Sequence, residues 1–289
     1  MGKFIITTDS TADLPKSYLK ENEVGILPMS FQIDGEEYDG DVEFDIISFY
    51  NKMRNGIMPT TSQVNPHTAR ERFQKYIDDG YDVLHISFSS GLSGSYNNVR
   101  LTALEMNEEN EANKIFVVDS LCASLGEGLL VHKAIQLKKE GKSIEEIVNW
   151  LEDNKLNVCH YFTVDDLNHL YRGGRVSKST AILGTMIGVK PVLHVDNEGH
   201  LVPVSKVRGR RQSLNALVKN MKELIDEYKE ENDIVFISHG DDEKAANYVA
   251  DLIKKEIGIN SFLINYIGPT VGAHSGPGTI ALFFMGARR

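Results

Sequence analysis

The sequence predicts an α/β fold in which a first domain, with a parallel sheet and a small β insertion, is followed by an α+β second domain. The length of 289 residues corresponds to about two domains at roughly 150 residues each. Short β-rich runs alternate with helical patterns in the first half, an order typical of a parallel sheet with helices on both faces. Further along, strands also follow one another directly, so we expect domains at residues 1–155 and 156–289.

The first domain is predicted from three pairs of a strand and a helix. Each pair joins a β-rich run to a helical pattern. The predicted pairs are residues 3–8 with 15–21, 82–87 with 93–107, and 114–118 with 120–139. Between the first two pairs, residues 24–45 form an irregular region with a hairpin pattern at residues 31–35. We interpret this region as the inserted β element.

One more helix closes the first domain, and a mixed set of elements builds the second. Ser143 followed by Glu146 is a capping box, so a helix should begin there and end near Asn154. Apolar residues between Leu214 and Tyr228 recur every three or four positions, which predicts a long helix. The other predicted elements are strands at residues 158–164, 191–195, 200–206, 233–238, 262–266 and 279–285 and a helix at residues 243–257.

Composition and charge indicate a compact cytoplasmic protein. The chain is 41% hydrophobic and 25% charged, which is close to the average of folded soluble proteins. Its 31 basic and 41 acidic side chains give a net charge of −10, which repels polyanions and makes nucleic acid a poor candidate partner. Cys122 and Cys159 stand apart in apolar contexts without a metal-binding spacing, so we expect two buried reduced thiols.

Three uncharged segments rich in glycine and small hydroxyl residues are candidates for one shared binding site. They are residues 59–63, 87–95 and 268–278, and all three are expected to be loops at the ends of elements. The second follows a strand at the carboxyl edge of the predicted sheet, where ligands bind in open α/β folds. A helix that begins near Ser93 would offer free N–H groups, and the hydroxyls of Thr61 and Ser93 would add donors. We therefore expect an anion-binding site without a cation, although turn and cap formation alone would also explain these residues.

Catalytic motifs match the chain only in part. Residues 91–95 resemble the nucleophile elbow G-x-S-x-G, but Ser95 stands where that motif needs glycine. A serine hydrolase that uses Ser93 with His274 and an acid such as Asp119 is therefore the weaker alternative. Residues 276–281 match the loose dinucleotide pattern G-x-G-x-x-A, but only eight residues follow them, and the sequence contains no P-loop motif.

Charged residues raise two further hypotheses. Residues 39–45 resemble a calcium loop, but Phe44 stands where an EF-hand requires glycine, and residues 239–242 are more typical of a helix cap than of a metal site. We therefore expect no metal.

Basic residues also gather near turns of the second domain, where they are either solvated or form a docking surface for an acidic or phosphate-bearing partner. These residues are Arg172, Arg175, Lys178, Lys206, Arg208, Arg210 and Arg211.

Seven short motifs, in their order along the chain, resemble the bacterial DegV family. The motifs are TTDSTAD at residues 7–13, TSQ at 61–63, SSGLSGSY at 89–96, VDS at 118–120, LYRGGRVS at 170–177, KP at 190–191 and GAHSGPG at 272–278. The resemblance covers essentially the whole chain. Members of this family include the fatty-acid-binding subunits of the two-component fatty acid kinase.

The resemblance implies a long-chain fatty acid in an apolar tunnel between the two domains. Its carboxylate would be held by the positions that match Thr61, Ser93 and His274, and Ser62 and Gly94 complete the expected ligand-binding set. His274 is left with three roles: a donor to the carboxylate, a stabiliser of developing charge, or a structural turn residue. No cofactor is implied, and the fatty acid is the ligand.

The resemblance also implies a partner kinase. That kinase would supply ATP and phosphorylate the fatty acid to an acyl phosphate, so this protein would be a carrier that presents the carboxylate and not the phosphotransferase. Docking of the kinase is expected at Arg172, Arg175, Lys206 and Arg208. Contact with a membrane would be at most transient, while lipid is loaded or unloaded.

Overall fold

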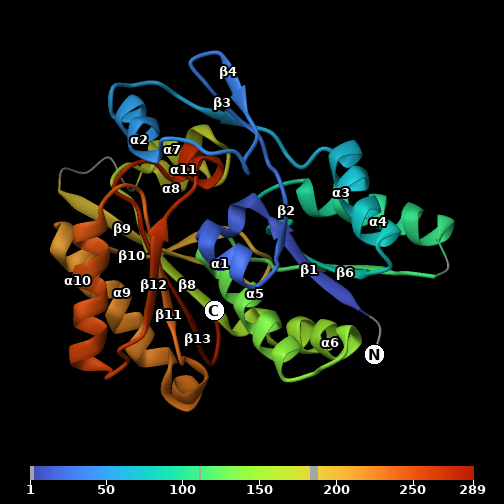
Figure 1. The fold of residues 1–289 in the computed structure, drawn as a ribbon. Helices are drawn as coiled ribbons and strands as arrows, with labels where there is room; N and C mark the ends of the chain where they lie inside the picture. Colours follow the sequence, from blue (N-terminus) through green and yellow to red (C-terminus); the bar gives the residue numbers. More distant parts are fainter. Residues whose placement is uncertain (1–2, 111, 183–187) are drawn as a thin grey trace.

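The fold consists of alternating layers of helices and sheets. The computed structural model describes residues 3–110, 112–182 and 188–289. Two main sheets pack against helix α5 (Leu125–Lys139), which is buried along most of its length, and further helices cover the outer faces of the sheets (Figure 1). This arrangement confirms the predicted mixed α/β fold class. We call the part before residue 158 the N-terminal half and the part from residue 158 onward the C-terminal half.

The sheet of the N-terminal half is parallel throughout. Its strands lie in the order β2-β1-β6-β7, and every pairing is parallel. Ile6 and Leu84 point toward α5, whereas Ile5 and Val83 point toward the helices of the opposite face, because successive side chains of a strand alternate between its faces. The strands are β1 (Phe4–Asp9), β2 (Gly25–Leu27), β6 (Asp82–Ser87) and β7 (Ile115–Asp119).

Helices α3 (Pro66–Asp78) and α4 (Ser95–Glu109) cover one face of this sheet. On the other face, α6 (Ile144–Asn154) packs beside α5. Helix α6 begins at the predicted capping box, in which Ser143 Oγ accepts from Glu146 N and the Glu146 carboxylate accepts from Ser143 N. The predicted start and end of this helix are therefore confirmed. The short helices η1 (Ser10–Ala12) and α1 (Lys16–Glu21) follow β1.

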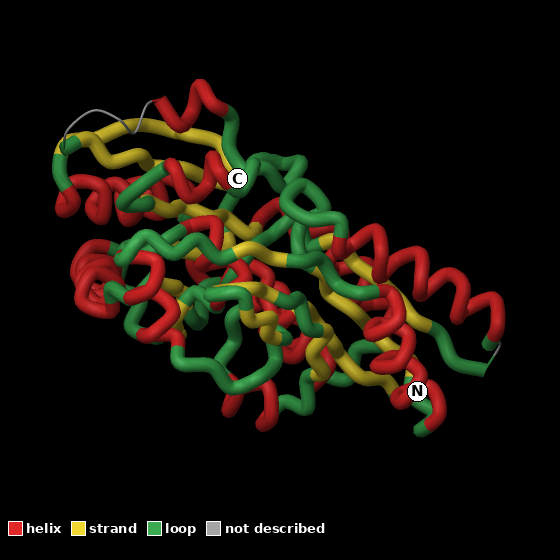
Figure 2. Tube along the Cα trace, turned by 90° about the horizontal axis from the view of Figure 1, so that it is seen from above, coloured by secondary structure: helices red, strands yellow, loops and turns green. Residues whose placement is uncertain are grey.

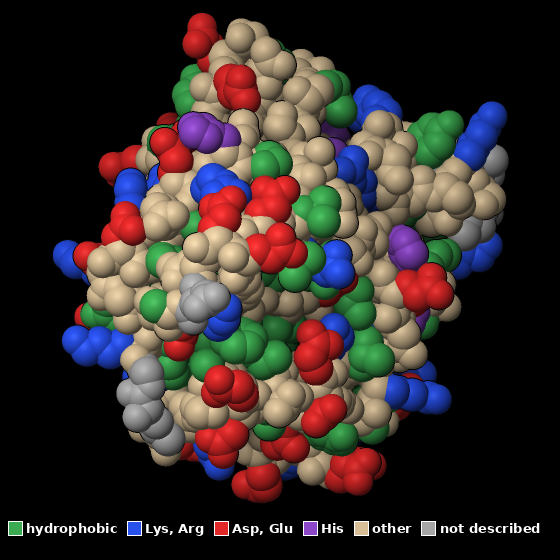
Figure 3. Space-filling model, turned by 90° about the vertical axis from the view of Figure 1, so that its right-hand side faces the viewer, with side chains coloured by type: hydrophobic (Ala, Val, Ile, Leu, Met, Phe, Trp, Pro, Cys, Tyr) green, Lys and Arg blue, Asp and Glu red, His purple; other side chains and the backbone are tan. Residues whose placement is uncertain are grey.

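The β insertion does not coincide with the expected residues 24–45, because β2 belongs to the main parallel sheet and the insertion continues beyond residue 45 to residues 60–61. The insertion is a hairpin of β3 (Phe31–Ile33) and β4 (Glu36–Tyr38), to which β5 (Thr60–Thr61) adds a third strand. Helix α2 (Ile46–Arg54) packs on this small sheet around a cluster of aromatic side chains. On the face of the molecule seen in Figure 3, acidic side chains gather in the lower part of the view, and Lys and Arg side chains are scattered.

The C-terminal half is built on a mixed six-stranded sheet in the order β10-β9-β8-β13-β11-β12, in which only β11 and β12 pair in parallel. One face of this sheet packs on α5, and the other packs on α9 and α10. The strands are β8 (Val158–Thr163), β9 (Val189–Val195), β10 (Leu201–Arg208), β11 (Val235–His239), β12 (Phe262–Tyr266) and β13 (Ile280–Met285). The helices are α7 (Asn168–Arg172), α8 (Lys178–Ile182), α9 (Arg210–Leu224), α10 (Glu243–Glu256) and α11 (Pro269–Ser275).

Two predictions about helices need correction. The long helix expected to reach Tyr228 ends at Leu224, and a 3-10 segment, η3 (Asp226–Glu231), follows it. The segment 268–278, expected to be a loop, contains α11, which begins with Pro269 at its first position. Proline suits that position because its missing N–H would have no helical partner there.

Both cysteines lie in the interior. The prediction of two buried free cysteines is confirmed for Cys122 and Cys159.

Figures 1 and 2 place the C-terminal end near the middle of the molecule and the N-terminus at its periphery. Among the described residues, no helix combines the length and the apolar character needed to cross a bilayer.

Candidate functional site

The best candidate site is a cavity of about 430 Å³ between the two halves of the molecule. All three uncharged segments contribute to its walls, as expected. Its polar lining residues and glycine are Thr61, Ser62, Gln63, Ser93, Gly94, Ser124, His160, Arg175, Thr270, His274, Ser275 and Thr279. Its apolar part is lined by Met29, Phe88, Leu92, Ala123, Phe162, Leu170, Val195, Leu201, Ile267, Val271, Ala281 and Phe283.

A contact between the two halves forms part of the polar wall. Thr61 Oγ1 lies 2.8 Å from His274 Nε2. Strand β5 positions Thr61 through its antiparallel pairing with β3, and α11 positions His274. A Cβ atom at Gly173 would collide with His274 Nδ1. The absence of a side chain at Gly173 therefore lets the turn after α7 approach the imidazole closely.

His274 is a neutral imidazole at physiological pH. Burial and the nearby Arg175 guanidinium lower its pKa from 6.5 to about 4, because both disfavour the imidazolium. A neutral imidazole carries one N–H and one acceptor nitrogen. His274 and Thr61 can therefore offer a donor to an acceptor placed in the cavity while they keep their mutual hydrogen bond.

Arg175 also lies in the cavity wall, which corrects the expectation of an anion site without a cation. Its Nε donates to Leu92 O at 3.1 Å, and its Nη1 donates to Gly173 O. Burial lowers its pKa, although a guanidinium stays charged near neutral pH. Arg175 was expected in an exposed docking surface, but the structure places it half-buried beside His274.

The start of α4 brings Ser93 and Gly94 to the cavity. The helix begins at Ser95 rather than near Ser93, with Gly94 as its N-cap residue. Ser93 Oγ lies 2.9 Å from Ser95 Oγ, and Ser95 Oγ accepts from Val64 N at 3.0 Å. A Cβ atom at Gly94 would collide with the end of the Gln63 side chain, which would have to move aside to make room for it.

The side chains of a serine-hydrolase triad are not assembled. Ser93 pairs with Ser95, and His274 pairs with Thr61. Asp119 accepts instead from the backbone N–H groups of Ser90 and Leu121. A nucleophile needs a base within hydrogen-bond reach, and Ser93 has none among the partners that the described structure gives it.

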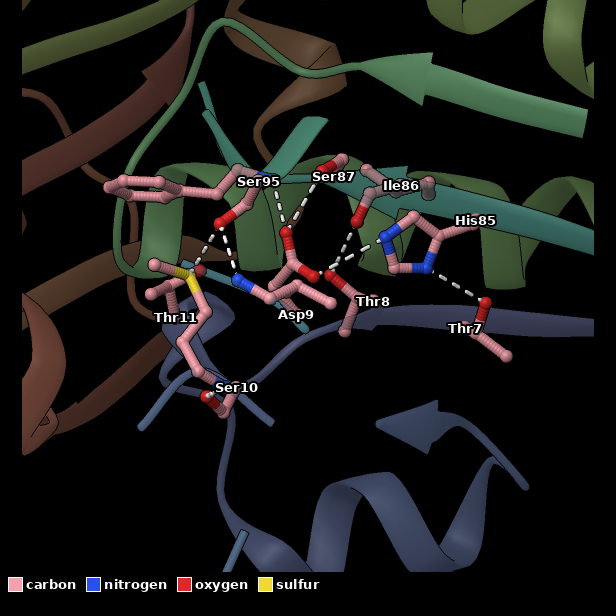
Figure 4. Close-up of polar contacts among 12 residues, drawn as sticks. Thr7, Thr8, Asp9, Ser10, Thr11, His85, Ile86, Ser87 and Ser95 are labelled. Atoms are coloured by element: carbon pink, nitrogen blue, oxygen red, sulfur yellow. Dashed lines mark hydrogen bonds and ion pairs between the residues drawn. The ribbon is translucent and has the colours of Figure 1, made fainter. Parts of the chain in front are cut away.

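A buried polar network supports the loop that carries Phe88 and Ser93 (Figure 4). Asp9 Oδ2 accepts from Ser87 Oγ at 2.9 Å and from Phe88 N at 2.8 Å. Asp9 Oδ1 lies 3.4 Å from His85 Nε2, and both side chains are fully buried. This network holds the carboxyl end of β6 against that of β1, and so fixes the start of the loop between β6 and α4.

Glu127 of α5 extends this network. Its carboxylate accepts from Thr8 Oγ1 at 2.7 Å and from Thr11 Oγ1 at 2.9 Å. Burial, followed by the nearby Asp9 carboxylate, raises its pKa well above the usual range. The sequence predicts no role for Asp9, His85 or Glu127, because their contacts join segments that are far apart along the chain.

The remaining basic residues expected to dock a partner are exposed. Arg172 lies at the end of α7, and Lys206 and Arg208 lie on β10. Arg210, by contrast, pairs with Asp242 at 2.7 Å.

The regions considered for metal binding have other roles. Asp45 caps α2 by accepting from Ile47 N and Ser48 N, and Asp242 caps α10 by accepting from Ala245 N. The helix-cap interpretation of residues 239–242 is therefore confirmed. Within the described parts of the chain, no three His, Cys, Asp or Glu side chains form a group that could hold a metal ion.

Comparison with known sequences identifies close relatives. A profile of the DegV family, described as uncharacterised proteins, matches residues 3–287. The DegV domain-containing protein CPE0026 of Clostridium perfringens is 43% identical over 288 residues, covering 99% of this chain and 98% of the relative. The DegV domain-containing protein YteA of Lactococcus lactis is 37% identical over 283 residues, covering 97% of this chain and 96% of the relative.

Comparison with solved structures identifies proteins of the same fold. A stearic acid-binding protein of Eubacterium ventriosum superposes with a TM-score of 0.89 at 26% identity, covering 98% of each chain. A DegV family protein of Thermus thermophilus described by its fatty acid binding has a TM-score of 0.87 at 27% identity, covering 98% of this chain and 99% of that one. DegV of Bacillus subtilis, a fatty acid binding protein, has a TM-score of 0.84 at 29% identity, covering 99% of this chain and 100% of that one.

Proposed function

The chain belongs to the DegV family, and on this basis we propose that it binds a long-chain fatty acid in the cavity between its halves. The observation that carries the proposal is the mixed lining of the cavity, which combines hydroxyl and imidazole groups, among them those of Thr61, Ser93 and His274, with many aliphatic and aromatic side chains. Such a wall suits a ligand with a polar head and an apolar tail. The solved structures of fatty-acid-binding relatives support the same ligand class.

The apolar tail would supply most of the affinity. Burial of about 15 methylene groups at ~0.8 kcal/mol each gives a gross driving force of about 12 kcal/mol before the entropic cost of binding. The tail would lie along the inner face of the six-stranded sheet, where Phe162 and Phe283 line the cavity. The head group then needs only hydrogen-bond partners, because it does not have to provide the affinity by itself.

The carboxylate would lie among Thr61, Ser93 and His274, with Ser62 and Gly94 beside them. A buried carboxylate without donors is costly, and the hydroxyls and the imidazole can supply neutral donors. The Arg175 guanidinium in the same wall adds a favourable potential while its Nε and Nη1 donate to the carbonyls of Leu92 and Gly173.

We further propose that a partner kinase acts on the bound acid. In that reaction a carboxylate oxygen bonds to the terminal phosphorus of ATP, the bond from this phosphorus to ADP breaks, and an acyl phosphate forms. Positioning and charge stabilisation dominate phosphoryl transfer, and the kinase would provide ATP and magnesium. This protein would hold and present the acid in the cytoplasm, and exposed Arg172, Lys206 and Arg208 would contact the kinase.

The test is extraction of the purified native protein with organic solvent, followed by mass spectrometry. A non-covalent fatty acid at close to one per chain is the expected result, and a Ser93→Ala variant purified in parallel should carry less. Protein that carries no fatty acid and takes up none when palmitic acid is supplied would contradict the proposal. Covalent labelling of Ser93 by a fluorophosphonate probe, together with ester turnover, would instead establish the hydrolase alternative.

A further inference from the structure

Asp13 is a buried carboxylate that contacts both halves of the molecule behind the cavity wall. Only 8% of its surface is exposed. Its Oδ2 accepts from Ser124 Oγ at 2.5 Å, and its Oδ1 accepts from Gly268 N at 2.9 Å. Ser124 is the N-cap residue of α5, and Gly268 is the N-cap residue of α11. One carboxylate therefore joins the starts of two helices that come from different halves.

Both partners of Asp13 lead directly to the cavity. Ser124 lines the cavity itself, and so do Ile267, Thr270 and His274, which lie next to Gly268 or on α11. Asp13 is not part of the wall, so it touches no bound ligand. It can act on a ligand only through the position of these neighbours.

The junction around Asp13 is closely fitted. A Cβ atom at Gly268 would lie 2.5 Å from Asp13 Oδ1, so this glycine allows the backbone to approach the carboxylate. Asn265 Nδ2 donates to Asp13 O at 2.7 Å, and Ser238 Oγ lies 3.0 Å from Ser124 Oγ. The C-terminal half thus holds Asp13 through residues of β12 and of the α11 N-cap, and holds Ser124 through β11.

We propose that Asp13 is a positioning residue for the polar end of the cavity. By tying the start of α11 to the start of α5, it fixes the helix that carries His274 relative to the N-terminal half that carries Thr61. The inference rests on the proposed function, which it deepens: recognition of the carboxylate head depends on a residue that the ligand does not touch.

The test compares two ligands with the same tail, palmitic acid and hexadecanol. Asp13→Gly removes the carboxylate and suits the left-handed backbone of this residue, whose φ is 53°. Asp13→Asn keeps an oxygen for Gly268 N and an amide that can donate to Ser124 Oγ. Arg54→Ala is the control, because it breaks another contact between the halves, with Asp241, and lies outside the cavity wall.

The ratio of the alcohol and acid dissociation constants reports recognition of the head group. We expect Asp13→Gly to lower this ratio about tenfold, the upper end of what the loss of one hydrogen bond to the head group costs. Asp13→Asn should restore the ratio, and Arg54→Ala should leave it unchanged. A general loosening of the two halves would weaken both ligands alike and leave the ratio as it is.

An unchanged ratio in folded Asp13→Gly protein would overturn the inference, as would equal weakening of both ligands. If Asp13→Gly does not fold, Asn265→Ala tests the same junction, because this substitution removes only the hydrogen bond to the Asp13 carbonyl. Asn265→Ala should then lower the ratio, and an unchanged ratio in this variant overturns the inference. Wild-type protein that binds neither ligand would overturn the proposed function and this inference with it. A wild-type preference for the acid that these variants leave intact would overturn this inference alone.

Discussion

Thr61 and His274 are 213 positions apart in the sequence, yet Thr61 Oγ1 and His274 Nε2 lie 2.8 Å apart. Thr61 belongs to the small sheet of the N-terminal half, and His274 belongs to α11 of the C-terminal half. The polar end of the cavity therefore exists only when the two halves are packed together. Substitutions at this contact should affect the head group of a ligand more than its tail.

Removal of either hydroxyl should weaken binding of a fatty acid. Thr61→Ala and Ser93→Ala each delete one donor to the carboxylate, and a loss of about 1 to 2 kcal/mol, roughly five- to thirtyfold in affinity, is expected. Isothermal titration calorimetry with palmitic acid measures the effect, and thermal unfolding of the free variants checks the fold. Wild-type lipid content and affinity in both variants would remove these residues from the site.

Binding of an acid should raise the pKa of His274. In the free protein burial, aided by Arg175, holds this pKa at about 4. A carboxylate in the cavity favours the imidazolium, so the pKa should rise toward its ordinary value of 6.5, and binding should take up protons in that pH range. Proton NMR of the imidazole during a pH titration measures the shift. Hexadecanol carries no charge and is the control; equal pKa values with both ligands would assign His274 a structural role.

The parts of the fold that could be predicted depend on local chemistry. The capping box at Ser143 fixes the start of α6, and the β-rich run of residues 82–87 gives β6 its observed limits. Helix α11 was missed because its segment is rich in glycine, and its position depends on distant contacts such as that of Gly268 N with Asp13. Local patterns carry no information on such contacts.

The candidate site could likewise be predicted from the sequence only in part. Uncharged composition, dense in glycine and small hydroxyl residues, was enough to select the three segments that line the cavity and carry Thr61, Ser93 and His274. The direction of the Arg175 side chain was not predictable, because it depends on contacts with distant segments, such as the hydrogen bond from its Nε to Leu92 O. The network of Asp9 and His85 was not predictable either, since it requires the register of β1 against β6.

Association with the proposed kinase should depend on salt and on three exposed cations. Reversing Arg172, Lys206 and Arg208 to glutamate should weaken association and remove most of its sensitivity to sodium chloride, because exposed charges act through a screened potential. Surface plasmon resonance at several salt concentrations measures this. Lys75→Glu, an exposed reversal on α3, is the control. Full production of acyl phosphate by the triple variant would refute the docking surface.

The Arg289 side chain should contribute strongly to stability. It is 9% exposed and donates to backbone carbonyls of both halves, among them Leu121 O at 2.8 Å, Lys155 O at 2.9 Å and Val158 O at 3.1 Å. Arg289→Met keeps much of the volume but leaves these carbonyls without their donor, so the free energy of unfolding should fall by roughly 3 kcal/mol. Urea denaturation measures the change. A loss below about 0.5 kcal/mol, typical of a surface substitution, would contradict this role.

The stability of the protein should depend on the protonation of Asp13. Burial raises the pKa of Asp13 from 3.8 to about 7, against the opposing effect of the hydrogen bonds from Ser124 and Gly268. At pH values between 3.8 and about 7, the folded chain keeps a proton on Asp13 that the unfolded chain has released. The stabilisation that this difference gives to the folded state is therefore complete below pH 3.8 and is lost as the pH rises through about 7. The free energy of unfolding of the wild type, relative to Asp13→Asn, should therefore fall with rising pH by up to ~1.4 kcal/mol per pH unit.

Taking the difference from Asp13→Asn cancels the contributions of other buried groups such as Glu127 and His160, provided that they titrate alike in both proteins. Urea denaturation of both proteins between about pH 5 and about pH 8 measures the difference, and a difference that does not vary with pH would show that Asp13 is ionised throughout this range.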